Sequence, residues 1–279
     1  MIQLHEWGRP RAPLLVCLHG VTSHGRHFAR LAERLADRFH VVAPDQRGHG
    51  GSTWEPPWHL EQYVEDALGA VPDEPAVWLG HSFGGRIAFE VAAAAAKRVE
   101  RLVLLDPAIR LPPHVGLNAA ESARLDRSYG SFDEGIDRRY EESLLTTAPR
   151  DLVEAELREH LLPSEDGRYR YRYCQSAVVA AYSEMTREPP PFEHVRVPTL
   201  LVLGATSYLP YDELLEPHAA ALGDLLEVVR IPAGHTVLWD ALDDTTGAIE
   251  RFLGRPPFGA RPGASRRCHP RAADRPSAR

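Results

Sequence analysis

One short stretch limits the possible folds of this chain more than any other: a serine between two glycines, in Gly80-His81-Ser82-Phe83-Gly84-Gly85. An apolar run, residues 76–79, leads into it, and a small-residue helical pattern, residues 86–92, leads out of it. The Gly-x-Ser-x-Gly spacing is typical of a tight strand-to-helix turn that exposes a nucleophilic serine. Side chains at the flanking glycines would collide with the neighbouring strand and helix. We therefore expect the Ser82 hydroxyl at a helix N-terminus, where free N–H groups favour developing negative charge.

Apolar stretches and helical patterns alternate along most of the chain. Strand patterns occur at residues 14–18, 40–43, 76–79, 101–105, 199–203 and 226–231, and helical patterns at 27–37, 60–68, 86–97, 214–222 and 241–253. A short alternating segment, residues 2–8, suits an edge strand. This order predicts an α/β fold with a mostly parallel, doubly wound sheet. In such sheets ligands bind at the carboxyl ends of the strands, where His19, Asp45, Ser82 and Asp106 are expected.

The alternation stops between about residues 110 and 190. Helical patterns occur there at residues 124–127, 151–162 and 174–186, no strand pattern is evident, and three prolines at 189–191 close the stretch. It is too long and too structured for a loop. We therefore expect a helical cap at residues 111–190, inserted into a core of residues 1–110 and 191–254. Residues 255–279 are rich in arginine and proline and nearly free of large apolar residues, which predicts a disordered tail.

Charge and composition argue against several classes of function. The net charge is −7, and because residues 255–279 carry +6, the rest of the chain carries −13, which disfavours a nucleic-acid partner. No apolar run approaches the ~18 residues needed to span a bilayer, and the N-terminus shows no signal-peptide pattern. Cys17, Cys174 and Cys268 are far apart, which favours a reduced, cytoplasmic protein. The histidines lack metal-ligand spacing, so we expect neither a metal nor a cofactor.

Four motifs occur in the order typical of α/β-hydrolase-fold proteins. They are His19-Gly20, Asp45-x-Arg47-Gly48-His49-Gly50-x-Ser52, the Gly80–Gly85 turn, and Gly234-His235 after the last predicted strand. Over residues 1–253 the chain resembles the serine esterase, lactonase and C–C hydrolase branch of that superfamily, whose members carry a helical cap. Serine at position 82 separates it from the haloalkane dehalogenase and epoxide hydrolase branches, which have aspartate there.

The resemblance implies a role for each motif. Ser82 is the candidate nucleophile and His235 the candidate general base, since a free hydroxyl needs an adjacent base. The backbone N–H groups of Val21 and Phe83 are the candidate oxyanion hole, with both side chains expected to line the pocket. Three further motif histidines receive structural roles, namely holding the oxyanion loop, closing the 47–50 turn and packing beside Ser82: His19, His49 and His81. Asp45 and Arg47 are expected to order the loop behind the site.

The acid of a Ser-His-acid triad is not at the position usual for the family. That position follows the strand ending at Gly204, and the first carboxylate after it is Asp212. A known alternative in the family places the acid after the preceding sheet strand, where Asp106 stands, and this keeps the order Ser, Asp, His. We favour Asp106 over Asp212, and a third possibility is that no acid remains.

These residues predict a serine hydrolase that cleaves a small, apolar ester, lactone, thioester or related carbonyl compound through an acyl-enzyme intermediate. A C–C bond hydrolase or a haloperoxidase-like enzyme would use the same three residues. A ligand-binding protein on a degenerate hydrolase fold is the alternative from another class, and the missing acid near residue 207 is its main support.

Overall fold

A computed structural model describes residues 1–145 and 147–255 of the chain. Its centre is a seven-stranded sheet with the order β1-β3-β2-β4-β5-β9-β10. The strands are β1 (Leu4–Trp7), β2 (Leu14–Leu18), β3 (His40–Pro44), β4 (Ala76–His81), β5 (Val99–Leu105), β9 (Thr199–Gly204) and β10 (Leu226–Ile231). The edge strand β1 pairs antiparallel with β3 and the other pairs are parallel, which confirms the predicted mostly parallel α/β fold.

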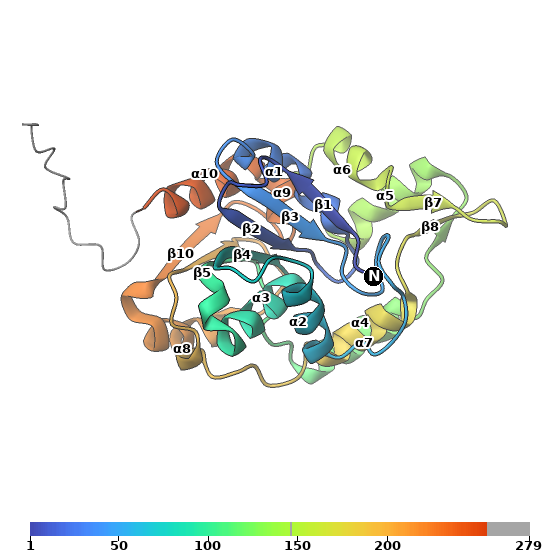
Figure 1. Ribbon diagram of the computed structural model, residues 1–279. Coiled ribbons are helices and arrows are strands. Elements are labelled where there is room, and N and C mark those ends of the chain that lie inside the picture. The colour runs from blue at the N-terminus through green and yellow to red at the C-terminus, as the bar shows by residue number, and fades with distance from the viewer. Residues whose placement is uncertain (146, 256–279) are drawn as a thin grey trace, which may run out of the picture.

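Side chains of the strands alternate between two buried faces of the sheet. In β2, Leu14, Val16 and Leu18 face one apolar cluster, while Leu15 and Cys17 face the other. The first cluster includes α2 (Leu60–Gly69), α3 (Phe83–Ala94) and α8 (Asp212–Leu222), and the second includes α1 (Ala29–Leu35) and α10 (Leu242–Leu253). Figure 1 shows α1 and α10 on one side of the sheet and α2 and α3 on the other. Burial on both faces explains why the inner strands β2, β3, β4, β5 and β9 read as nearly continuous apolar runs, unlike the edge strands β1 and β10.

Residues 106–198, which we call the inserted segment, connect β5 to β9. The segment contains α4 (Pro113–Ala123), β6 (Ser128–Tyr129), α5 (Phe132–Glu142), α6 (Arg150–Leu157), β7 (Leu161–Pro163), β8 (Tyr169–Tyr171) and α7 (Gln175–Glu184). In Figure 1 these helices lie to the right of the sheet, with α5 and α6 above and α4 and α7 below. Part of the segment has an apolar cluster of its own, which includes Ile136, Val153 and Leu157 and also receives Trp239 from outside the segment.

Short helical turns complete the described chain: η1 (Gly25–Phe28), η2 (Ala96–Arg98), η3 (Phe192–His194), η4 (Gly223–Leu225) and α9 (Val237–Asp240). The predicted disordered tail lies, apart from Arg255, outside the described residues.

Three expectations for the inserted segment are wrong. Residues 124–127 form no helix, because α4 ends at Ala123 and the chain turns there. The helical pattern at 151–162 is a helix only as far as Leu157. The segment also contains an antiparallel sheet in the order β6-β8-β7, where no strand was expected. Strands of two or three residues are too short to show a period-two pattern, which explains why they were missed.

Candidate active site

Ser82 lies between β4 and α3 in a strained backbone conformation, with φ 54° and ψ −118°. Neighbouring backbone holds it there: its N–H donates to Leu105 O at 3.1 Å, and its carbonyl accepts from the N–H groups of Gly85 and Ala108 at 2.9 and 3.0 Å. The strained turn is therefore fixed by hydrogen bonds to the next strand and to the start of the inserted segment.

The glycines on each side of Ser82 leave no room for a side chain. A Cβ atom at position 80 would lie 2.2 Å from Gly84 O, and one at position 84 would lie 2.0 Å from Leu18 O. Both contacts are with backbone, which cannot move aside. The steric reason inferred from the Gly-x-Ser-x-Gly pattern therefore agrees with the packing of β4, α3 and β2.

Asp106 and His235 are in contact beyond the carboxyl ends of the strands, Asp106 after β5 and His235 after β10. Nδ1 of His235 lies 2.7 Å from Oδ2 of Asp106. An ionised carboxylate only accepts, so Nδ1 carries the proton and Nε2 is left free to take one. Asp106 is 3% exposed and also accepts the Gly204 N–H at 3.0 Å and the Ser207 hydroxyl. The carboxylate is thus held by three donors and orients the imidazole.

Asp212, the alternative acid, is remote from this contact. Its side chain is 86% exposed and forms an ion pair with Arg230 at 2.7 Å. Ser207, which stands in the loop where the family usually has its acid, donates to Asp106 instead. The loop after β9 therefore contributes a hydroxyl that supports the carboxylate, a role that no pattern in the sequence indicates.

One cavity, of about 150 Å³, has both Ser82 and His235 in its lining. Ser82 and His235 line it from the sheet edge, Val21 from the loop after β2, and Arg139 and Tyr182 from the inserted segment. Pockets for drug-sized ligands are about 300–1,000 Å³. The cavity therefore suits a small substrate.

The two candidate oxyanion donors have free N–H groups. Phe83 is the first residue of α3, so its N–H has no helical partner. Within the described residues neither it nor the Val21 N–H donates a hydrogen bond to the protein. The Val21 side chain lines the cavity as expected, but that of Phe83 does not. The Phe83 ring is fully buried and packs edge-on against Tyr63, 5.1 Å between centroids, so only its backbone can serve the site.

The motif histidines fix the loops around the cavity. Nε2 of His19 accepts the Gln46 N–H at 2.9 Å, so its Nδ1 donates to Gly20 O at 2.8 Å. His49 places its two ring nitrogens 3.0 Å from Arg47 O and 2.7 Å from Val21 O, which ties the 47–50 turn to the oxyanion loop. These contacts fit the structural roles expected for both residues.

His81 does more than pack beside Ser82. Its Nε2 lies 2.9 Å from the carbonyl oxygen of His235, and the two rings are 4.8 Å apart. Burial lowers the pKa of His81 well below its usual value, and the neighbouring His235 and His27 lower it further. A neutral His81 therefore donates to the backbone of His235 and positions it.

The loop behind the site is ordered by charge. The Asp45 carboxylate accepts the N–H groups of Gly25 and Gly51, each at 2.8 Å, and lies 3.0 Å from His5 Nε2. Burial favours the neutral acid, but these hydrogen bonds outweigh it and lower the pKa of Asp45. Arg47 forms a two-pronged ion pair with Asp66 at 2.7 and 2.8 Å.

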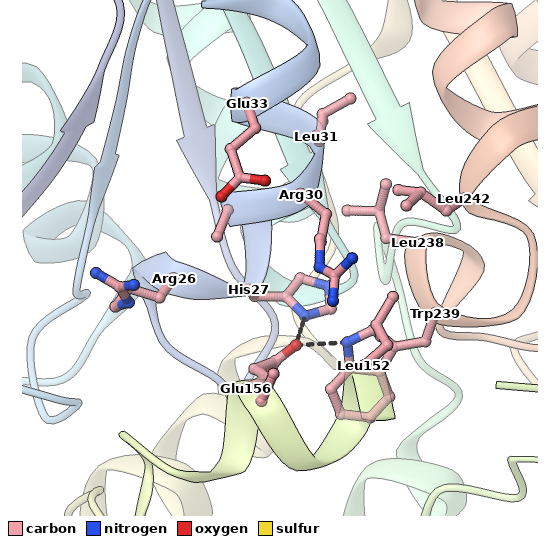
Figure 2. Close-up of a pocket in the computed structure, with 12 residues that line it drawn as sticks. Arg26, His27, Arg30, Leu31, Glu33, Leu152, Glu156, Leu238, Trp239 and Leu242 are labelled. Atoms are coloured by element: carbon pink, nitrogen blue, oxygen red, sulfur yellow. Dashed lines mark hydrogen bonds and ion pairs between the residues drawn. The ribbon is translucent and has the colours of Figure 1, made fainter. Parts of the chain in front are cut away.

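A second cavity, of about 160 Å³, lies on the other side of His27 and contains neither Ser82 nor His235. Figure 2 shows Glu156 of α6 at its base, joined by dashed lines to His27 and Trp239. Although burial favours the neutral acid, the neighbouring His27 lowers the pKa of Glu156 below its usual value. Both hydrogen-bond partners of Glu156, His27 and Trp239, come from outside the inserted segment, as does His24, whose Nε2 lies 3.9 Å from its other oxygen. These contacts link α6 to the core.

Comparison with known proteins identifies the family. The model of the alpha/beta hydrolase family matches residues 15–248. The lipase LipV of Mycobacterium tuberculosis is 34% identical over 91% of this chain and 99% of its own length. The 2-(acetamidomethylene)succinate hydrolase of Mesorhizobium japonicum is 28% identical over 90% of this chain and 92% of its own length. A crystal structure of E-2-(acetamidomethylene)succinate hydrolase has a TM-score of 0.80 at 26% identity, over 91% of this chain and 95% of that one.

The chain therefore belongs to the alpha/beta hydrolase family, as its four motifs predicted, and it is an enzyme of the hydrolase class. Its relatives include esterases, lipases and other hydrolases. Across residues 1–145 and 147–255, no helix is both long enough and apolar enough to cross a membrane. The same residues contain no cluster of three or more histidine, cysteine or acidic side chains that could hold a metal ion.

Proposed function

We propose that this hydrolase cleaves a small ester, lactone, thioester or related carbonyl compound through a covalent acyl-enzyme intermediate. Ser82 is the nucleophile, His235 the general base, and Asp106 the acid that orients it. The observation that carries the proposal is the 2.7 Å contact between His235 Nδ1 and Asp106, beside a cavity that Ser82 and His235 line together. The same contact removes the main support for a degenerate, non-catalytic fold, because a carboxylate is present.

Acylation begins with attack of Ser82 Oγ on the substrate carbonyl carbon, while Nε2 of His235 takes the hydroxyl proton. The carbonyl oxygen becomes an oxyanion, which accepts the free N–H groups of Val21 and Phe83. When the intermediate collapses, the bond to the leaving oxygen or sulfur breaks and His235 returns its proton to that atom. The products of this half-reaction are an acyl ester on Ser82 and a free alcohol or thiol.

Deacylation repeats these steps with water. His235 takes a proton from water as the oxygen attacks the acyl carbon, and the same two N–H groups accept the second oxyanion. The bond to Ser82 Oγ then breaks, His235 returns the proton to Oγ, and a carboxylic acid leaves. Each oxyanion donor is worth about 3 kcal/mol in reactions of this type.

Two other features of the enzyme are part of this proposal. We propose that residues 111–190 act as a cap that closes the cavity, because Arg139 and Tyr182 line it from that side. We also propose that the enzyme works in the reducing cytoplasm, where the free thiols of Cys17 and Cys174 would persist.

The direct test is Ser82→Ala assayed with a series of short- to medium-chain acyl esters. We expect kcat to fall at least about 10³-fold, and labelling by a fluorophosphonate probe to disappear. Ser183→Ala, which removes an exposed hydroxyl on α7, is the matched control and should keep both activity and labelling. Undiminished turnover by Ser82→Ala would refute the proposal.

A further inference from the structure

Arg139 of α5 is a buried cation in the wall of the Ser82 cavity. The residue is 7% exposed, and no other lysine, arginine, aspartate or glutamate of the described chain lines this cavity. Its guanidinium lies over the rings of Tyr171 and Trp239, 5.5 and 5.3 Å from their centroids. These two aromatic faces hold the plane of the guanidinium in one orientation.

The guanidinium lacks the partners that a buried charge normally has. Its one hydrogen bond within the described residues is a long one, 3.4 Å from Nη1 to Thr22 Oγ1, and Nε is buried with no partner. Arginine does not deprotonate at ordinary pH, so this charge cannot be avoided. Burying a charge without an ion-pair partner is costly, and proteins rarely do it.

The nearest candidate counter-ions are already engaged. Glu156 binds His27 and the Trp239 indole, and Glu142 binds Arg127 and the Tyr129 hydroxyl. Among the described residues, neither carboxylate forms an ion pair with Arg139. The donors of Arg139 are therefore left for a group that enters the cavity.

We propose that Arg139 binds a carboxylate on the substrate, so that the preferred substrates carry a free carboxylate close to the bond that is cleaved. The proposal rests on the hydrolase function proposed above and narrows its substrate class. A planar guanidinium presents paired N–H donors that match the two oxygens of a carboxylate. The small cavity, of about 150 Å³, requires both groups of the substrate to lie close together. This differs from the purely apolar substrate expected from the sequence.

The test uses substrate pairs in which an isopropyl group replaces the carboxylate. Monomethyl glutarate and methyl 5-methylhexanoate differ in this way on the acyl side, and acetoxyacetate and isobutyl acetate differ in this way on the alcohol side. Hydrolysis is followed by proton release. For at least one pair we expect the wild type to prefer the anionic member by about 10- to 100-fold in kcat/KM, as for hydrogen bonds to a charged group.

Arg139→Gln should abolish that preference. Its kcat/KM for the anionic ester should fall about 10- to 100-fold, mainly through KM, while the neutral ester changes less than about 3-fold. Arg139→Lys should restore part of the preference. Arg138→Gln is the matched control on the same helix, since Arg138 is 52% exposed and pairs with Glu141 at 2.6 Å, and it should change neither substrate.

A second readout is competition. Free glutarate should inhibit hydrolysis of the neutral ester by the wild type, and this inhibition should weaken in Arg139→Gln. Thermal unfolding shows whether each variant is folded. If Arg139→Gln does not fold, the charge preference of the wild type is compared with that of Arg139→Lys alone. Arg139 would be merely a packing residue if the wild type showed no preference in either pair, or if Arg139→Gln slowed both members equally.

Failure of the underlying function gives a different result. If Ser82→Ala hydrolysed the neutral ester as fast as the wild type, the hydrolytic mechanism itself would be wrong. If the neutral ester required Ser82 but Arg139 had no effect on charge preference, only the carboxylate proposal would fall.

Discussion

The carboxyl ends of the strands, which we call the sheet edge, and the inserted segment supply opposite walls of the Ser82 cavity. These two walls are held in place by different interactions. On the sheet edge, Ser82 and Asp106 directly follow strands, and backbone hydrogen bonds to neighbouring strands hold them, at 3.1 Å to Leu105 O and 2.7 Å to Val202 O. On the opposite wall, Arg139 lies within a helix, and its side chain is positioned by ring packing. The proposed catalytic groups therefore depend on backbone geometry, whereas the proposed substrate recognition depends on side-chain packing.

Two buried arginines, Arg86 and Arg139, also differ in how their charges are held. Arg86 of α3 is 1% exposed, and its guanidinium donates to the carbonyl of Ile109, to the carbonyls of Arg187 and Glu188 at 3.1 Å each, and to Glu90. These carbonyls lie near the two ends of the inserted segment, so Arg86 ties the segment to the core. Arg139 is almost as buried but has one long hydrogen bond. A fully partnered buried charge serves structure, and a poorly partnered one in a cavity wall is available to a ligand.

The largest expected effect is the loss of activity when Asp106, at the sheet edge, is replaced. Asp106→Asn should lower kcat on a neutral ester by about 10⁴-fold, because an amide can hold the imidazole in the wrong tautomer and cannot stabilise its charged form. The loss should appear in kcat more than in KM. The measurement is steady-state kinetics, with circular dichroism to show that the variant is folded.

Asp212→Asn is the matched control for this variant. Its carboxylate is exposed and pairs with Arg230, so we expect activity within about 2-fold of the wild type, as for most surface substitutions. If Asp212→Asn were the more damaging of the two, the acid would be Asp212, at the start of α8, and the present assignment would be reversed.

The next largest effect is a difference in the free energy of unfolding between variants of Arg86 and of Arg139. Arg86→Met should lower the free energy of unfolding by about 3–5 kcal/mol, because it leaves Glu90 and several buried carbonyls without their donor. Arg139→Met should leave that free energy unchanged or raise it, since it removes a buried charge that lacks an ion-pair partner. Urea unfolding of both variants measures the difference. Equal destabilisation by the two substitutions would mean that Arg139 is as structural as Arg86.

The sequence predicted the sheet edge better than the opposite wall, for a physical reason. The backbone turn at Ser82 requires glycine at fixed positions, so the motif is visible in the sequence, and the order of strands places Asp106 and His235 near it. The contact between those two residues is the one the sequence favoured, and their catalytic roles stay predictions. The supporting hydroxyl of Ser207 was missed, because no local pattern shows which neighbour a loop serine will bind.

The inserted segment was harder to predict because its residues meet only through tertiary packing. Its strands are too short to show a period, and Arg139 looks like its exposed neighbour Arg138 when read alone. One feature of the sequence does distinguish Arg139 from Arg138. Phe132, Ile136 and Arg139 share a helical face, so a cation occupies a position where an apolar residue is expected. A charge on the buried face of an amphipathic helix is therefore the feature to search for in caps of this kind.

The smallest effect concerns a contact between the core and the inserted segment at low pH. His24, which precedes η1, stacks on His160, which follows α6, with ring centroids 4.6 Å apart. Burial lowers the pKa of each to about 3. For His24 the neighbouring His160 imidazole adds to this effect, and for His160 the positive charge of Arg139 does so. In the unfolded chain both would titrate near 6.5. Between about pH 6.5 and pH 3 the unfolded state therefore binds more protons, and the free energy of unfolding falls as the pH falls.

The slope should approach about 1.4 kcal/mol per pH unit for each buried histidine. Urea unfolding at about pH 7 and about pH 5 measures it. His160→Gln keeps a donor for Thr22 O, which His160 Nε2 approaches at 3.1 Å, but cannot be protonated, so the loss of stability on acidification should be smaller. His114→Gln removes an exposed histidine on α4 and should leave the slope as in the wild type. An unchanged slope in His160→Gln would mean that acid acts on other groups, and that protonation of this histidine pair does not separate the inserted segment from the core.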